Sequence, residues 1–400
     1  MAKKESYRCS ECGWLSAKWQ GQCRQCQAWG TLAEVGTSAG LAKTAVRTPI
    51  QAAQPISQVS AESAQARPSG VGELDRVLGG GIVPGAVILL AGEPGVGKST
   101  LLLTVAANAA RQAKLTGTGS VLYITGEESA SQVRLRAARI DALADNLLLA
   151  AETELGAVLG QVEQANPALL IVDSVQTIAS ADVEGSAGGT SQVRAVAASI
   201  IALAKERNIP VLLVGHVTKD GGIAGPRVLE HLVDVVCQFE GERHARLRLL
   251  RAVKNRYGPT DEVGCFELGE RGIVELADPS GLFLSQARSE VPGTCATVTL
   301  EGRRPMAIEI QALVASTHAG SPRRTTSRTA MALAVLQARM KVDTSSSDVY
   351  VSTVGGAKAI EPAADLALAI AVVSAARNLP TPPGLVAFGE VGLTGELRDV

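Results

Sequence analysis

A glycine-rich segment between a short apolar run and a helical pattern carries the clearest chemical signal in the sequence. Residues 92–99 read Gly-Glu-Pro-Gly-Val-Gly-Lys-Ser and fit the pattern G-x-x-x-x-G-K-[ST]. In such a loop, backbone N–H groups and the following helix N-terminus bind phosphates, the lysine reaches the terminal phosphates and the serine ligates Mg²⁺. We therefore expect ATP to bind here. The expected nucleotide-binding residues are Gly92, Glu93, Pro94, Gly95, Val96, Gly97, Lys98, Ser99 and Thr100, with Ser99 also a magnesium ligand.

Acidic side chains follow two apolar runs downstream of this loop. Asp173 ends ALLIVD, where a carboxylate can hold Mg²⁺ through water, and Glu127 and Glu128 follow VLYIT. Because ligands bind at the carboxyl ends of parallel strands, we expect one glutamate to be the base for the attacking water, and we prefer Glu127. Alternatively, either glutamate caps the helix that begins near Ser129. His216, at the end of another apolar run, either senses the γ-phosphate or DNA or is a packed bystander.

Four cysteines near the N-terminus have the spacing of a metal site. Cys9, Cys12, Cys23 and Cys26 form C-x2-C-x10-C-x2-C, which predicts a structural Zn²⁺ centre with four thiolate ligands. Iron in a rubredoxin-like cage, or two disulfides or a redox pair, are the less favoured interpretations. Trp19, beside Lys18 and near Arg24, would stack on single-stranded bases; equally, the tryptophans of this module form its small core.

Composition divides the chain into four parts: a zinc finger at 1–35, a flexible linker at 36–66, a nucleotide-binding domain at 67–275 and a third domain at 285–400. In the second domain, short apolar runs alternate with helical patterns, which is typical of an α/β fold with a parallel sheet covered by helices. The expected strands are 87–92, 121–125, 168–173, 210–217, 233–240 and 245–253. The third domain begins with strand-like segments and continues with two Ala-rich helical patterns, 329–340 and 363–379.

Overall composition excludes several classes of protein. The 400 residues are 46% hydrophobic and 19% charged, which excludes disorder over most of the chain. With 38 basic and 39 acidic residues, the net charge predicts no polyanion partner, so any nucleic-acid surface must come from local clustering. The most apolar stretch, 366–376, is too short to span a bilayer, and the N-terminus lacks the apolar segment of a signal peptide. We expect a cytoplasmic protein without a membrane partner.

Motifs around these residues resemble the bacterial RadA (Sms) DNA repair protein family. They are ELDRVLGGGIVPG before the phosphate loop, GEES at 126–129, DSVQT at 173–177, GHVTKDGGIAGPRVLEH at 215–231 and KNRYG at 254–258. The resemblance implies a four-cysteine zinc finger, a RecA-like ATPase domain and a Lon-protease-like α/β domain. It also implies a homo-hexameric motor that binds single-stranded and branched DNA and promotes branch migration with the RecA recombinase. Tyr257 replaces the family's usual phenylalanine, from which we expect little change.

The Lon-like part departs from an active protease. Where a Lon protease places its nucleophilic serine between proline and alanine, this chain has Pro362-Ala363-Ala364. The pattern stops at Val400, before the position of the catalytic lysine, so we expect a non-proteolytic domain that is truncated at its C-terminus.

Basic residues gather in two further places. Six lie within 243–256, namely Arg243, Arg246, Arg248, Arg251, Lys254 and Arg256; five more are Arg303, Arg304, Arg323, Arg324 and Arg328. Both groups either bind DNA phosphates or form solvated faces and interface salt bridges. We also expect the loops at 184–194 and 221–227 to face the pore of a ring, unless they are plain connectors.

Two basic residues receive a catalytic assignment. In a RecA-like ring, KNRYG would reach a neighbour's nucleotide, and Lys254 or Arg256 would act as a finger in trans. Alternatively, the run only contacts DNA phosphate.

Two other functions compete with a DNA motor. A KaiC-like regulatory ATPase would act on protein partners, and DNA-stimulated hydrolysis would distinguish it. An ATP-dependent protease is disfavoured by Ala363.

Overall fold

The computed structural model describes residues 7–34, 55–58, 64–216, 227–241, 246–269, 272–285, 291–316 and 327–400. The chain forms two compact units, residues 1–60 and 61–400. Most of the expected linker, 36–66, lies outside the described residues; Ile56–Gln58 within it forms a single 3₁₀ turn (η1).

The N-terminal unit is a small ribbon of three strands, β1 (Tyr7–Cys9), β2 (Leu15–Ser16) and β3 (Leu32–Glu34). β1 pairs antiparallel with both neighbours, in the order β2-β1-β3. Cys9, Cys23 and Leu32 are buried, with Tyr7 and Trp14 packed against them. A core of five side chains is too small to hold a fold by itself, so a bound metal must supply much of the stability.

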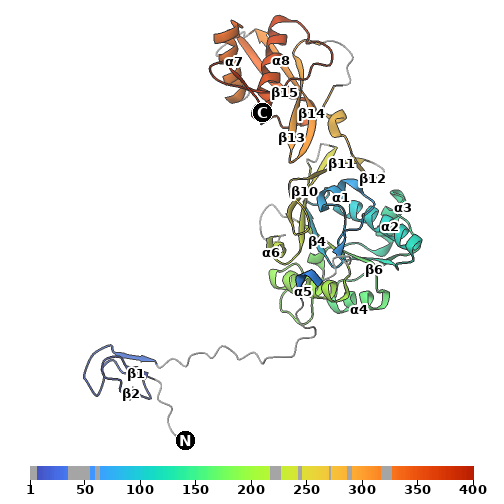
Figure 1. The fold of residues 1–400 in the computed structure, drawn as a ribbon. Helices are drawn as coiled ribbons and strands as arrows, with labels where there is room; N and C mark the ends of the chain where they lie inside the picture. Colours follow the sequence, from blue (N-terminus) through green and yellow to red (C-terminus); the bar gives the residue numbers. More distant parts are fainter. Residues whose placement is uncertain are drawn as a thin grey trace. The chain divides into compact units, whose positions relative to one another are not determined.

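A large sheet dominates the second unit (Figure 1). It has nine strands in the order β12-β11-β10-β9-β4-β8-β7-β5-β6. The six strands from β9 to β6 are parallel to one another. Their bounds are β4 Val87–Gly92, β5 Val121–Thr125, β6 Leu147–Ala151, β7 Leu169–Asp173, β8 Val211–His216 and β9 Val235–Glu240. Every residue of β4, β5 and β7 is buried, because helices cover both faces of the sheet.

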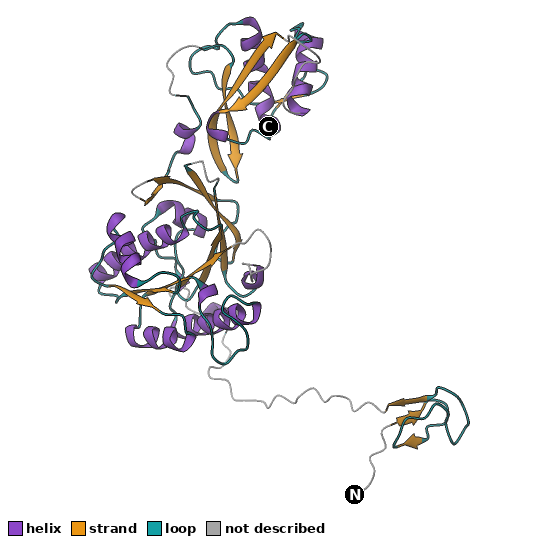
Figure 2. Ribbon diagram, turned by 180° about the vertical axis from the view of Figure 1, so that it is seen from behind, coloured by secondary structure: helices purple, strands orange, loops and turns teal. Residues whose placement is uncertain are grey.

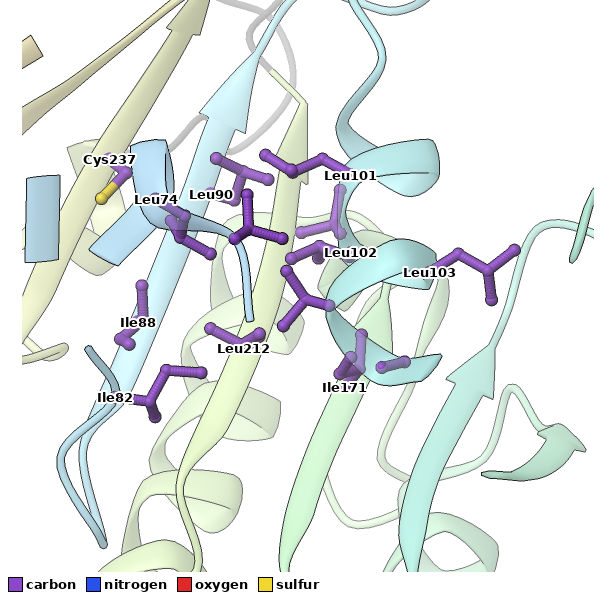
Figure 3. Close-up of a cluster of buried hydrophobic side chains, with 14 of the residues drawn as sticks. Leu74, Ile82, Ile88, Leu90, Leu101, Leu102, Leu103, Ile171, Leu212 and Cys237 are labelled. Carbon is purple, nitrogen blue, oxygen red and sulfur yellow. The ribbon is translucent and has the colours of Figure 1, made fainter. Parts of the chain in front are cut away.

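Side chains alternate between the two faces. Ile88 and Leu90 join a cluster with α1 (Gly72–Leu78), α2 (Lys98–Thr116) and α3 (Ala130–Arg139). Figure 3 shows part of this cluster, including Leu74 of α1 and Leu101 of α2. Leu89 joins the opposite cluster, with residues of α4, α5 and α6. These helices span Leu155–Ala165, Thr190–Arg207 and Arg227–Glu230, and a 3₁₀ turn, η3, spans Val175–Thr177. The prediction of a mixed α/β fold with a central parallel sheet is confirmed.

Three antiparallel strands extend this sheet beyond β9: β10 (Leu247–Asn255), β11 (Val263–Gly269) and β12 (Gly272–Glu275). Phe239 of β9 and Phe266 of β11 pack edge to face, with ring centroids 5.7 Å apart. This extension was not predicted as such, because an apolar run does not reveal the direction of its neighbour.

The C-terminal part has a separate sheet in the order β13-β14-β15, with helices α7 and α8 against it (Figure 2). The bounds are β13 Thr294–Glu301, β14 Arg304–Ser316, β15 Ser347–Thr353, α7 Ser327–Met340 and α8 Asp365–Arg377. A two-stranded ribbon, β16 (Glu390–Val391) and β17 (Leu397–Arg398), and three 3₁₀ turns, η4 (Pro279–Leu282), η5 (Val354–Gly356) and η6 (Pro362–Ala364), complete it.

Arg304 is a buried tie between β14 and the nucleotide-binding fold. Its guanidinium pairs with Glu73 of α1, and both side chains are about 5% exposed. It also donates to the carbonyl oxygens of Val263, Leu276 and Ala277. The expectation that Arg304 belongs to a DNA-binding group is wrong, since a guanidinium with its donors occupied inside the protein cannot contact phosphate.

We expect Arg304→Met to lower the free energy of unfolding by about 3–5 kcal/mol, because the buried Glu73 carboxylate loses its buried cationic partner and keeps only the half-exposed Arg76, 3.6 Å from Oε1. Urea unfolding measures the loss. Arg303→Ala is the matched control: Arg303 pairs with Asp261 at the surface, and such a pair contributes about 0–1 kcal/mol. Equal losses for the two variants would contradict the structural role of Arg304.

Candidate functional site

The phosphate loop connects β4 to α2 at the carboxyl edge of the parallel sheet. Its glycines are required by space and backbone conformation. A Cβ at Gly92 would lie 2.5 Å from the carbonyl oxygen of Phe239, and Gly97 has φ +113°, where a Cβ would lie 2.5 Å from Ile273 Cδ1. The loop therefore holds backbone N–H groups at the start of α2 without side chains in the way, as a phosphate site needs.

Lys98 is directed into the loop rather than into solvent. It is 4% exposed, and its Nζ donates to the carbonyl oxygens of Gly92 and Glu93 at 2.8 and 2.9 Å. Burial lowers its pKa to about 8, against the opposing charges of Asp173 and Glu127. The negative charge of a phosphate bound in the loop would raise this pKa again, because it favours the charged form of the amine.

Asp173 ends β7 near Lys98 and offers one free oxygen. Its Oδ2 accepts a hydrogen bond from Tyr123 Oη at 2.7 Å, whereas Oδ1 is buried and has no partner among the described residues. Burial, and then the charge of Asp173, raises the pKa of Tyr123 well above its usual value, so Tyr123 remains the donor. A buried carboxylate oxygen without a donor fits a hydrated cation, and Ser99 supplies a hydroxyl in the first turn of α2. The residues present thus fit Mg²⁺.

The two adjacent glutamates have different surroundings. Glu127 Oε1 accepts from Ser174 Oγ at 2.7 Å and lies 2.9 Å from His216 Nε2. Glu128 instead pairs with Arg136 of α3. Neither caps α3, because Ser129 is the N-cap and forms a capping box with Gln132. Glu127 therefore faces the strand-end cluster of Ser174 and His216, while Glu128 faces the helix.

Two residues of this site were not singled out from the sequence: Tyr123 and Ser174. Tyr123 and Ser174 hold the two functional carboxylates. Ser174 belongs to DSVQT, so the motif signalled it, but its role depends on a side-chain direction that a motif does not give.

Lys254 and Arg256 lie at the other end of the parallel strands, where β4 and β9 begin. β10 ends beside the start of β9, where Asn255 pairs with Val235, and β9 begins beside Ile88 of β4. At about 3.3 Å per residue, the start of β4 is about 16 Å from Gly92. Neither side chain can therefore serve the phosphate loop of its own chain.

A buried carboxylate anchors the turn that carries these two residues. Asp234 accepts from Lys205 Nζ at 2.5 Å, from Val87 N at 3.0 Å and from Arg256 Nη1 at 3.1 Å. Burial opposes its ionisation, but Lys205 and the Val87 N–H outweigh this and hold the pKa of Asp234 below its usual range. Lys254 Nζ donates to the carbonyl oxygens of Glu230 and Val233, both at 2.7 Å. The turn is thus presented in a fixed geometry.

The expected basic stripe along 243–256 is wrong at Arg248, and its neighbours Arg246 and Arg251 form salt bridges. Arg248 is 5% exposed and shares the core face of β10 with buried Leu250 and Ala252. Arg251 is tied to Glu240 and Glu301, and Arg246 pairs with Glu267. Arg243 lies outside the described residues. The alternation with leucine places Arg246 and Arg248 on one face of the chain, which is exposed at Arg246 and buried from Arg248 onward.

The second basic group is likewise divided. Arg328 donates to Asp365, which is buried, while Arg323 and Arg324 lie outside the described residues.

Of the two expected loops, 184–194 is partly helix, because α5 begins at Thr190, and Gln192 binds the carbonyl oxygens of Ser180 and Val183. Residues 221–226 of the other loop lie outside the described residues.

The four N-terminal cysteines converge on one point. Their sulfur atoms all lie within 4.8 Å of one another, with Cys9–Cys26 at 3.7 Å and Cys12–Cys23 at 3.6 Å. A tetrahedral site with metal–sulfur bonds of about 2.3 Å places its sulfurs about 3.8 Å apart. The residues therefore fit a closed, four-thiolate metal centre of the structural kind.

Cys9→Ser with Cys12→Ser should release the metal, about one Zn²⁺ per chain, and unfold only the N-terminal unit. Elemental analysis identifies the metal, and near-UV circular dichroism with ATP hydrolysis reports on the rest of the chain. Iron in place of zinc would overturn the choice of metal. Loss of the nucleotide-binding fold along with the metal would contradict the division into two units.

The tryptophans of this unit are not all core residues. Trp14 packs against the buried cluster, but Trp19 and Trp29 are 63% and 76% exposed. The interpretation that the tryptophans simply form the core is wrong for these two. They leave flat apolar surface available to a base or a protein partner.

In the part of the chain that the structure describes, no helix is long and apolar enough to cross a membrane.

Comparison with known proteins agrees with both centres. A family model described as an AAA domain matches residues 53–222, and one described as a rubredoxin metal binding domain matches residues 7–34. The chain is 52% identical over 406 residues to the DNA repair protein RadA of Mycobacterium tuberculosis, covering 99% of this chain and 84% of the relative. Identity is 51% to the protein of that name from Mycolicibacterium smegmatis (99% and 87% covered) and 45% to that from Pseudomonas aeruginosa (100% and 89%).

Proposed function

The chain belongs to the RadA family of DNA repair proteins, and from this premise we propose that it is a DNA-dependent ATPase that acts in homologous recombination. Family membership and the AAA domain support a DNA repair ATPase. The observation that carries the catalytic proposal is the convergence of Lys98, Asp173 and Glu127 at one edge of the sheet.

In this proposal each side chain has one task. Lys98 and the N–H groups of the loop bind the terminal phosphates, and Ser99 and Asp173 hold the magnesium. Bound magnesium supplies charge neutralisation at the phosphate oxygens. Glu127 accepts the proton of the attacking water, and its Oε1 is kept in place by Ser174.

The assembly we propose is a homo-hexameric ring in which ATP binds between subunits. Lys254 or Arg256, too far from the nucleotide of its own chain, then reaches the nucleotide of the neighbour and stabilises charge on the γ-phosphate. The fixed turn at Asp234 supports this role, because a finger acting across an interface must be positioned before the interface forms.

The partners we propose are single-stranded and branched DNA and the RecA recombinase, with branch migration as the outcome of hydrolysis in the cytoplasm. The C-terminal domain would be a non-proteolytic platform, since η6 presents Pro362, Ala363 and Ala364 where a Lon protease needs its serine. We propose that the chain has four parts: the zinc finger at 1–35, the linker at 36–66, the nucleotide-binding domain at 67–275 and the third domain at 285–400.

A preformed three-strand junction tests this function. With ATP and RecA, the chain should extend the heteroduplex faster than RecA alone, and Lys98→Ala should not. A protein that hydrolyses ATP equally with and without DNA and leaves the junction unchanged would instead fit a KaiC-like regulator. Digestion of casein would contradict a non-proteolytic C-terminal domain.

A further inference from the structure

Gln176 of η3 is a buried amide without a use. The residue is 9% exposed, and both its Oε1 and its Nε2 are buried with no partner among the described residues. Burying an amide without hydrogen bonds destabilises a fold, and native structures leave few such groups. A glutamine retained here in this form points to a second conformation in which the amide is paired.

The amide lies against the end of β8. The pairing of β7 with β8 stops at Val172 and Leu213, whereas β8 continues to His216. Past that point η3 takes the place of β7, and a Cβ built on Gly215 would lie 3.8 Å from Gln176 Nε2. The amide therefore lies close to the Gly215 backbone, within ordinary contact of a Cβ built there.

The next residue of β8 contains a second unsatisfied group. His216 Nδ1 is buried and has no partner among the described residues, and Nε2 lies 2.9 Å from Glu127 Oε1 without the alignment of a hydrogen bond. Gln176 and His216 therefore both place unsatisfied polar atoms at one strand end. That strand end lies next to the buried amide at Gly215 and next to the proposed base, Glu127, at His216.

We propose that Gln176 is a positioning residue that couples DNA binding to ATP hydrolysis. In the DNA-bound form its amide pairs with the backbone at Gly215 and His216, and this shift brings His216 into line with Glu127. The inference rests on the proposed DNA-dependent ATPase and adds the side chain that transmits the stimulus. A merely structural glutamine would instead have its amide satisfied in the form described here.

Gln192 of α5 provides the matched control. It is 1% exposed, and its amide is fully used: Oε1 accepts from Ser180 N at 2.8 Å, and Nε2 donates to the carbonyl oxygens of Ser180 and Val183. Methionine has nearly the same length as glutamine and no amide. Gln192→Met should therefore lower the melting temperature by several degrees, while Gln176→Met should leave it unchanged or raise it.

The test compares ATP hydrolysis by wild type, Gln176→Met and Gln192→Met, each with and without single-stranded DNA. For Gln176→Met, the ratio of the rate with DNA to the rate without should fall about tenfold relative to wild type, without loss of thermal stability. A wild-type ratio in Gln176→Met, or a lower melting temperature with parallel losses of both rates, would overturn the inference. A wild-type protein that DNA does not stimulate would contradict the proposed function itself, and this coupling would fall with it.

Discussion

Glu127→Gln should lower the rate of ATP hydrolysis by about 10²-fold or more and leave ATP binding near the wild-type level. The amide keeps the shape of the side chain and its contact with Ser174 but cannot accept the proton of the attacking water. Single-turnover hydrolysis measures the chemical step, and binding of a fluorescent ATP analogue measures affinity. Lys98→Ala, in contrast, should weaken binding as well, because the phosphates lose their fixed counter-charge.

Glu128→Gln is the matched control for this prediction. Glu128 is adjacent in the chain but pairs with Arg136, so we expect it to affect α3 more than the chemical step. A Glu128→Gln variant without activity beside a nearly wild-type Glu127→Gln would show that the base had been assigned to the wrong carboxylate.

Lys254→Ala should abolish DNA-stimulated hydrolysis and branch migration while each subunit still binds ATP. A finger supplied in trans contributes about 10³-fold or more to the rate in the best-studied cases. The decisive measurement mixes two inactive proteins: Lys98→Ala subunits, which retain Lys254, are added to Lys254→Ala subunits, which retain a phosphate loop. Hydrolysis should reappear in the mixed assemblies, because a complete site then forms at some subunit boundaries.

Two controls accompany the mixing. Lys254 also donates to the carbonyl oxygens of Glu230 and Val233, so a melting curve must show that Lys254→Ala remains folded. Doping with the double variant Lys98→Ala/Lys254→Ala should restore nothing. No rescue in well-mixed assemblies, together with weaker DNA binding by Lys254→Ala alone, would make Lys254 a DNA contact.

The parallel sheet could be read from the sequence because its strands are buried on both faces. β4, β5 and β7 are continuous apolar runs, and each was predicted to within one residue. β6 was missed: in Leu147–Ala151 every residue is partly or fully exposed, so the edge strand leaves little signal. Lys98, Asp173 and Glu127 were expected together, since carboxyl ends of parallel strands share one edge.

Partners of the basic residues could not be read in the same way. Arg304 meets Glu73 across 231 positions of sequence, and Arg328 meets Asp365 across 37. A basic residue in a sequence is the same whether it lies in solvent or in a buried pair, and only the packing of α1 against β11 for the first pair, and of α7 against α8 for the second, separates the cases. The unpaired amide of Gln176 was hidden for the same reason.

The central claim is that this phosphate loop hydrolyses ATP in response to DNA. The most direct measurement is phosphate release by the full chain with Mg²⁺, with and without single-stranded DNA, using Lys98→Ala as the blank. We predict low release without DNA, a several-fold increase with it, and neither in Lys98→Ala. Release that DNA leaves unchanged, or that persists in Lys98→Ala, would contradict the account.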